Sequence, residues 1–278
     1  MTVSRRIFLA SAGLLAAGGC AAGSPSAKES GMRKISYGED ASQYGELSSP
    51  EGAGQRAGVA VVIHGGYWRA RYGAELGRPL AADLAAHGVT VWNLEYRRAG
   101  NGGGWPQTFD DVSAGIDKLG ELGVDTSRVV LVGHSAGGHL AVWAAGRGKL
   151  PGQVPGAAPK VPVTAVVSQS GLLDLKAARE LNLSDGAVRN LLGGSPDDER
   201  YRLADPMQQL PLGLPVYAVY GEADDTVPPQ LSMDYAAAAQ AAGDPAELIA
   251  VPGDHFALID VTTPAWAKCR ELTLAALR

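Results

Sequence analysis

The sequence predicts an α/β protein with a mostly parallel central sheet, helices on both faces of the sheet and a short insertion above the strand ends. From residue 59 onward, short apolar runs alternate with helical patterns of roughly ten to fifteen residues, as in repeated βαβ units. Several of these runs are followed directly by polar motifs, and a parallel sheet brings such motifs to one edge. With 278 residues, 46% of them hydrophobic, the chain is long enough for one such domain.

The N-terminal segment is expected to lie outside this fold. Residues 1–20 contain an S-R-R-x-F-L sequence at positions 4–9 before a short apolar run, which predicts a twin-arginine export signal and a location outside the cytoplasm. Cys20 ends a sequence that resembles a lipobox, so lipidation with membrane attachment and plain cleavage with secretion remain alternatives. Residues 21–31 are small and polar and predict a flexible tether to a domain over residues 32–278.

Apolar and β-branched runs predict strands at residues 59–63, 89–94, 129–132, 164–167, 216–220 and 248–251. Helical spacing predicts helices at residues 75–86, 109–122, directly after Ser135, 230–242 and 264–277. Residues 37–50 have no helical period and predict irregular structure or edge strands. Residues 171–214 break the alternation with a polar, proline-punctuated stretch, which predicts the insertion above the strand ends.

Composition and residue spacing exclude several classes of function. The net charge is −5 and the isoelectric point is near 5.6, so nucleic acid is not an expected partner. Cys269 is the single cysteine beyond the signal, which precludes an intramolecular disulfide in the mature domain. His134 and His139 are five residues apart, a spacing that does not place two metal ligands on one helix face. No metal and no cofactor are therefore expected.

The stretch from Gly133 to Gly137 is a G-x-S-x-G motif between a predicted strand and a predicted helix. A turn this sharp holds its central residue, Ser135, in a strained backbone conformation, and a side chain two positions away would clash. The small flanking residues therefore favour a serine hydroxyl that projects from the top of the sheet.

A serine hydroxyl needs an imidazole to take its proton and a carboxylate to orient that imidazole. Asp224 and Asp225 follow the predicted strand at 216–220, and His255 follows the strand at 248–251. Both positions lie at carboxyl ends of strands, the same edge as Ser135. Of the two neighbouring carboxylates, the spacing of the G-x-x-D-x-x-V-P pattern favours Asp224.

Together these motifs resemble those of the α/β-hydrolase superfamily, in its esterase branch, from about residue 59 to the C-terminus. The H-G-G-Y-W sequence at 64–68 resembles kynurenine formamidases and related bacterial carboxylesterases. The G-H-S-A-G-G-H-L and G-x-x-D-x-x-V-P patterns are also similar to hormone-sensitive-lipase-like and prolyl-oligopeptidase-like hydrolases. The resemblance implies Ser135 as nucleophile, Asp224 as the acid and His255 as the base.

The resemblance also implies an oxyanion hole built from backbone N–H groups of Gly65, Gly66 and Ala136. The stretch Glu95-Tyr96-Arg97-Arg98 is expected to form an ion-pair and hydrogen-bond network that supports this glycine loop, with substrate contact as the alternative. Three aromatic residues are candidates for the substrate pocket: Tyr67, Trp68 and Trp105. For Trp105, a position in the hydrophobic core is an equal alternative.

The sequence thus predicts a serine hydrolase that cleaves carboxylic esters with small or medium acyl groups through an acyl-serine intermediate. The partner is a small-molecule ester or amide. An arylformamidase is an alternative because of the H-G-G-Y-W loop, and a peptidase similar to prolyl oligopeptidases is another. A non-catalytic binding module is an alternative of a different class, although such a module would be expected to lose part of the serine, acid and base set. The oligomeric state is not predicted.

Overall fold

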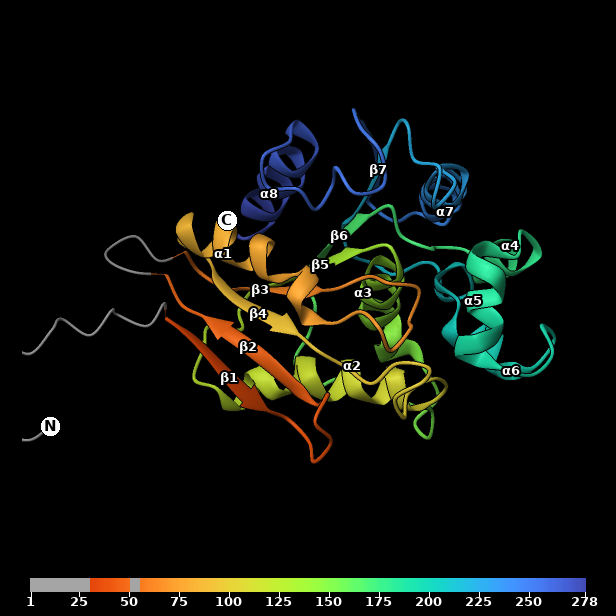
Figure 1. The fold of residues 1–278 in the computed structure, drawn as a ribbon, viewed down its shortest axis with the longest axis horizontal. Coiled ribbons are helices and arrows are strands. Elements are labelled where there is room, and N and C mark those ends of the chain that lie inside the picture. Colours follow the sequence, from red (N-terminus) through yellow and green to blue (C-terminus); the bar gives the residue numbers. More distant parts are fainter. Residues whose placement is uncertain (1–30, 51–55) are drawn as a thin grey trace, which may run out of the picture. The chain divides into compact units, whose positions relative to one another are not determined.

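The computed structural model describes residues 31–50 and 56–278. The strands within these residues form one mixed sheet (Figure 1). The strands run across the sheet in the order β1-β2-β4-β3-β5-β6-β7-β8. Their bounds are Met32–Ser36 for β1, Tyr44–Ser48 for β2, Val59–Ile63 for β3, Thr90–Leu94 for β4, Val129–His134 for β5, Ala165–Gln169 for β6, Val216–Gly221 for β7 and Ala246–Val251 for β8.

The sheet is parallel from β4 through β3 and β5 to β8, as the alternation of strands and helices predicted. Strands β3, β4 and β5 are buried at every position, which is typical of strands covered on both faces. Residues 37–50 contain strand β2, but the prediction of an edge strand there was wrong in position, because β2 pairs with β1 on one side and antiparallel with β4 on the other, which leaves β1 at the edge. Strand β1 was not predicted, because its side chains are mostly exposed and leave no alternating pattern.

Helices cover both faces of the sheet, as predicted. Helices α1 (Arg78–Ala86) and α8 (Pro264–Ala276) lie on one face, where Leu84 and Trp266 share a core with β3 and β5. Helices α2 (Gln107–Asp117), α3 (Ala136–Gly146) and α7 (Gln230–Ala241) pack on the second core, which contains Phe109, Trp143 and Tyr235.

Two predicted helices are each divided into a 3-10 turn and an α-helix. The prediction of one helix at 75–86 was too simple. A 3-10 turn over Ala74–Leu76 comes first, and the α-helix α1 begins only after Gly77. Pro79 has no backbone N–H and therefore suits the first turn of a helix, which explains why α1 begins at this point. The prediction at 109–122 covers α2 and a 3-10 turn over Lys118–Glu121.

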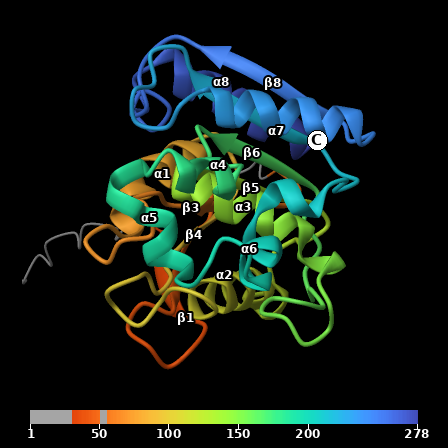
Figure 2. The ribbon, with the colours of Figure 1, turned by 90° about the vertical axis from the view of Figure 1, so that its right-hand side faces the viewer.

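The stretch after β6 is an insertion, as predicted, and it is built of short helices that the sequence analysis did not predict (Figure 2). They are α4 (Leu175–Glu180), α5 (Leu183–Leu192), α6 (Glu199–Ala204) and a 3-10 turn over Pro206–Gln209.

At the start of α5, the three residues Ser184–Gly186 have left-handed backbone angles, with φ of 46°, 51° and 76°. Arg69, on the segment after β3, donates a hydrogen bond to the carbonyl oxygen of Ser184. The insertion is thus attached to the edge of the sheet that carries the polar motifs.

None of the helices within residues 31–50 and 56–278 is both long and apolar enough to cross a lipid bilayer. Cys269 lies buried in α8 and has no disulfide partner among the residues that the structure describes. The predicted export signal over residues 1–20, the tether up to residue 30 and Cys20 lie outside the described residues.

Candidate active site

Ser135 occupies a sharp turn between β5 and α3, as the motif predicted. Its φ is 56° and its ψ is −119°, a conformation that L-residues rarely adopt. A Cβ on Gly133 would lie 2.2 Å from the carbonyl oxygen of Gly137, and a Cβ on Gly137 would lie 2.0 Å from that of Ile63. Only glycine fits at both positions, because the turn presses the start of α3 against the ends of β3 and β5.

The turn places Ser135 on the wall of a cavity of about 230 Å³, and His255 lines the same cavity. His255 lies in the loop after β8, and its side chain is almost completely buried. The structure therefore brings the two residues to one site from positions 120 apart in the sequence. Most of the remaining wall is apolar or aromatic: Tyr67, Tyr72, Leu76, Phe256 and Ile259.

Asp224, in the loop after β7, contacts His255. The Nδ1–H of His255 donates to Asp224 Oδ2 over 2.8 Å, while Asp224 Oδ1 accepts from the backbone N–H of Val227 over 2.8 Å. Burial of the Asp224 carboxyl disfavours its charge, but the hydrogen bond and charge of His255 outweigh burial and lower its pKa. Asp225 is exposed and bonds instead to the hydroxyl of Thr226. Nδ1 of His255 is thus occupied as a donor, which leaves Nε2 as the free acceptor.

His134 supports the loop that carries His255. Its Nε2–H donates to the carbonyl oxygen of His255 over 2.9 Å, and the two ring centroids are 4.5 Å apart. Burial, with a smaller contribution from the charge of His255, lowers the pKa of His134 to about 3. His134 therefore stays neutral and holds the His255 backbone in place.

The glycine loop after β3 lies directly against Ser135. A Cβ on Gly65 would lie 2.8 Å from the carbonyl oxygen of His134 and 3.1 Å from Cβ of Ser135, so this close approach requires glycine. Gly66 has a φ of 108° and lines the cavity. Ala136 is the first residue of α3, where backbone N–H groups have no partner inside the helix.

The expected network behind this loop is confirmed. His64 Nε2 lies 3.2 Å from Glu95 Oε1, and Arg98 forms a buried ion pair with the same carboxylate. The N–H of Ala74 donates to Glu95 Oε2, and the hydroxyl of Tyr96 donates to the carbonyl oxygen of His64. These contacts fix the end of β3, and with it the glycine loop, against the segment that follows β4.

The three aromatic pocket candidates lie in different environments. Tyr67 lines the cavity, and its hydroxyl donates to the carbonyl oxygen of Thr226 over 2.7 Å. Burial, followed by the charge of Asp224, raises the pKa of Tyr67 to about 12. Trp68 is completely buried and packs edge-on against His139, at 5.1 Å between ring centroids. Trp105 is partly buried and packs on Phe109. Neither tryptophan lines the cavity.

Several residues on the cavity wall were not found by the sequence analysis, among them Arg71, Ser184 and Ile259. They belong to three separate segments, and none lies in a motif with a chemical signature. Phe256 also lines the cavity and is 59% exposed; its place directly after His255 was a signal that sequence reasoning had available.

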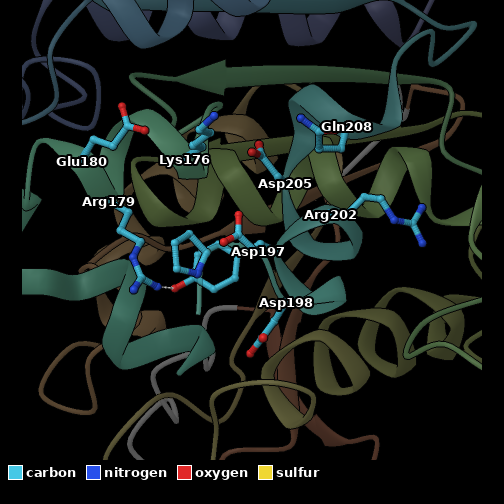
Figure 3. Close-up of a pocket in the computed structure, with 10 residues that line it drawn as sticks. Lys176, Arg179, Glu180, Asp197, Asp198, Arg202, Asp205 and Gln208 are labelled. Carbon is cyan, nitrogen blue, oxygen red and sulfur yellow. Dashed lines mark hydrogen bonds between the residues drawn. The ribbon is translucent and has the colours of Figure 1, made fainter. Parts of the chain in front are cut away.

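A second cavity, of about 550 Å³, lies within the insertion and contains none of the residues discussed so far (Figure 3). Acidic and basic side chains surround it, and Asp205 is the most buried of them. The Asp205 carboxylate accepts from the backbone N–H groups of Leu175 and Met207, both over 3.2 Å. Burial raises the pKa of Asp205 to about 7 although these donors oppose it. Asp205 thus joins α4 to the 3-10 turn that follows α6.

The sheet order, the turn at Ser135 and the loops after β7 and β8 define this chain as an α/β-hydrolase in fold. The chain belongs to the BD-FAE family, whose model matches residues 46–238.

Two curated relatives are both named as esterases. Esterase LipQ of Mycobacterium tuberculosis is 26% identical over an alignment of 202 residues that covers 68% of this chain and 47% of LipQ. The isoprenylcysteine alpha-carbonyl methylesterase ICME of Arabidopsis thaliana is 28% identical over an alignment of 242 residues that covers 80% of this chain and 55% of ICME. The chain therefore spans about half the length of these relatives.

Solved structures share the fold. A truncated carbohydrate esterase from gut microbiota superposes with a TM-score of 0.73 at 21% identity, covering 90% of this chain and 98% of that one. Esterase B from Lactobacillus rhamnosis gives a TM-score of 0.77 at 20% identity, covering 88% and 84% of the two chains. The butyrate-bound esterase 2 of Thermogutta terrifontis gives 0.70 at 22% identity, covering 89% and 93%.

Proposed function

We propose that this protein is a serine hydrolase that cleaves carboxylic esters through an acyl-serine intermediate. The observation that carries the proposal is the convergence of Ser135 and His255 on one cavity, with His255 held by Asp224 over 2.8 Å. Both curated relatives are esterases by name, which supports the same reaction class.

In the proposed reaction, Ser135 Oγ attacks the ester carbonyl carbon while its proton passes to Nε2 of His255. Asp224 keeps the Nδ1–H of His255 in place and stabilises the imidazolium that forms. The imidazolium then gives its proton to the alcohol oxygen as the C–O bond breaks. Water repeats the sequence on the acyl-serine, with His255 again as base, and releases the acid.

Negative charge develops on the carbonyl oxygen during attack. The backbone N–H groups of Gly65, Gly66 and Ala136 are proposed to bind this oxyanion, which is supported by the close approach of Gly65 to Ser135 and by the place of Ala136 at the start of α3. One such donor contributes about 3 to 4 kcal/mol to the stabilisation of a transition state. The positive end of the α3 dipole points at the same place and adds to it.

The cavity volume supports a small or medium acyl group. An apolar cavity of about 150 Å³ is large enough for benzene. The cavity at Ser135 is about 230 Å³ and is largely apolar, so it accommodates a short chain or one small ring with a few further atoms.

Replacement of Ser135 tests the proposed nucleophile. Purified Ser135→Ala is expected to lose several orders of magnitude in the turnover of p-nitrophenyl acetate, since loss of a triad nucleophile costs about 10⁶-fold in kcat. The exposed Ser127 serves as a matched control, and Ser127→Ala should keep the wild-type rate. A serine-directed fluorophosphonate should add its mass to the wild-type protein and not to Ser135→Ala. Equal turnover by Ser135→Ala and wild type would contradict the proposal.

Formamide and peptide cleavage use the same three groups, so a substrate panel separates these alternatives. The loop at residues 64–68 favours aryl formamides as the second candidate. The panel contains p-nitrophenyl esters of graded length, N-formylkynurenine and an aminoacyl anilide, all at equal enzyme concentration. Ester hydrolysis is expected to have the largest kcat/KM, with the acetate to hexanoate range preferred over long acyl chains.

We further propose that the protein acts outside the cytoplasm, on the basis of the twin-arginine pattern in residues 1–20. Replacing Arg5 and Arg6 by Lys should leave the protein in the cytoplasmic fraction of its native host. If Cys20 is lipidated, the wild-type protein will appear in the membrane fraction and Cys20→Ala will not. Recovery of both forms as soluble exported protein supports plain cleavage instead.

A further inference from the structure

The cavity at Ser135 has an exposed cation on its otherwise mostly apolar wall. Arg71 lies in the segment between the glycine loop and Gly73, and it lines the cavity together with Tyr72. The guanidinium carbon of Arg71 is 4.9 Å from the centroid of the Tyr72 ring. This contact places the cation beside an aromatic face that is itself part of the wall.

Arg71 has neither a carboxylate nor a carbonyl partner for its guanidinium among the described residues, unlike the arginines near it. Arg97 is bound by Asp111 and Arg98 by Glu95. Arg69, two residues before Arg71, donates to the carbonyl oxygen of Ser184. Within the part of the chain that the structure describes, no carboxylate pairs with the positive charge of Arg71, which is therefore available to a bound molecule.

We propose that Arg71 selects ester substrates that carry a second acidic group, a carboxylate, at the end of the acyl chain. The inference rests on the proposed function and specifies its substrate class. An arginine guanidinium is planar and matches a carboxylate with two parallel hydrogen bonds. A short apolar chain between the ester and the carboxylate lies along Tyr72, Leu76 and Ile259 while the ester carbonyl lies at Ser135.

The size of the cavity limits this class to short half-esters of dicarboxylic acids. A half-ester of a dicarboxylic acid carries its carboxylate on the acyl side of the ester bond, and about 230 Å³ leaves room for a chain of a few methylene groups between the two. Because Arg71 is exposed, its attraction for the carboxylate is screened by salt. The preference should therefore be strongest at low ionic strength.

The test compares two esters of the same acyl length, p-nitrophenyl hexanoate and mono-p-nitrophenyl adipate. The adipate differs by a terminal carboxylate in place of a methyl group. The measured quantity is the ratio of kcat/KM for adipate to that for hexanoate. In Arg71→Gln this ratio is expected to fall about tenfold from the wild-type value, and in Arg71→Glu further. Arg71→Lys keeps the charge but loses the two parallel hydrogen bonds, so its ratio should lie between those of wild type and Arg71→Gln. High salt should lower the wild-type ratio toward that of Arg71→Gln.

Arg33→Gln is the matched control, since Arg33 is exposed on β1, away from the cavity lining, and its substitution should leave the ratio unchanged. An unchanged ratio in Arg71→Gln overturns the inference while ester hydrolysis itself stands. If neither ester is hydrolysed faster by wild type than by Ser135→Ala, the proposed function is overturned, and the inference with it.

Discussion

At the proposed active site, small distances decide the role of each side chain. Asp224 and Asp225 are adjacent carboxylates, yet only the former contacts His255, and its oxygens are otherwise held by backbone N–H groups. A carboxylate at this place fixes the imidazole tautomer. It accepts a hydrogen bond from Nδ1–H, so the proton stays on Nδ1 and Nε2 carries a free lone pair.

Substitution of the two aspartates by asparagine separates them. Asp224→Asn is expected to lower kcat for p-nitrophenyl acetate by about 10⁴-fold, since an amide in this position favours the wrong tautomer. Asp225→Asn should remain within a few-fold of wild type, because its side chain is exposed and bonds to Thr226. Steady-state kinetics on both purified variants check the ranking, and the reverse order would assign the acid to Asp225.

Tyr67 shows how a residue of the wall also positions the proposed machinery. Its ring lines the cavity, and its hydroxyl joins the glycine loop to the loop of Asp224 through the Thr226 carbonyl oxygen. Because the Tyr67 pKa is raised to about 12, the hydroxyl keeps its proton at neutral pH and remains a donor in this contact.

The strands and the helix around Ser135 pack so closely that their contact positions have no room for a side chain. Strand β5 and helix α3 meet at Gly133 and Gly137, and the start of α3 approaches the carbonyl oxygens of Ile63 and His64 at the end of β3. The strained φ of Ser135 is thus maintained by contacts of its neighbours with two strands.

Gly137→Ala tests this packing. The added Cβ would lie 2.0 Å from a backbone oxygen of β3, so α3 or β3 must shift. We expect a loss of about 1 to 3 kcal/mol in the free energy of unfolding, as for other over-packed positions, together with a clear loss of esterase turnover. Gly120→Ala is the control, because its Cβ would meet only Val161 at 3.4 Å. Chemical denaturation of both variants measures the difference, and an equal, small effect would contradict the close packing described here.

The stability of the whole domain is expected to depend on pH through Asp205. Burial raises the pKa of Asp205 to about 7, against 3.8 for the free side chain. Between these values the folded protein binds a proton that the unfolded chain has released, so folding is favoured at low pH. The free energy of unfolding contributed by this group is therefore largest below about pH 4 and is lost as the pH rises to about 7.

Asp205→Asn removes this titration and keeps an oxygen that accepts from Leu175 and Met207. Relative to Asp205→Asn, the wild-type protein should lose on the order of 3 kcal/mol in its free energy of unfolding between pH 4 and pH 7. Denaturant unfolding at several pH values measures this difference. The control is Asp197→Asn, at an exposed carboxylate on the same cavity. A difference between Asp205→Asn and wild type that is constant with pH would contradict the prediction.

Local patterns were sufficient for much of the fold. The runs at 59–63 and 129–132 are strands because β-branched residues without polar interruptions form strands that are buried on both faces. The helices of the insertion were missed because each is short, and the left-handed residues at the start of α5 interrupt any helical period.

The sequence by itself determined the α/β alternation, the turn at Ser135 and the positions of Asp224 and His255 after their strands, because each depends on spacing along a few residues. Only the tertiary structure decided which side chains line the cavity. Trp68 is buried in the core and Arg71 lines the cavity, although both residues come shortly after the same two glycines. A cavity wall is assembled from segments far apart in the chain, and no local period records which of their residues will face one another.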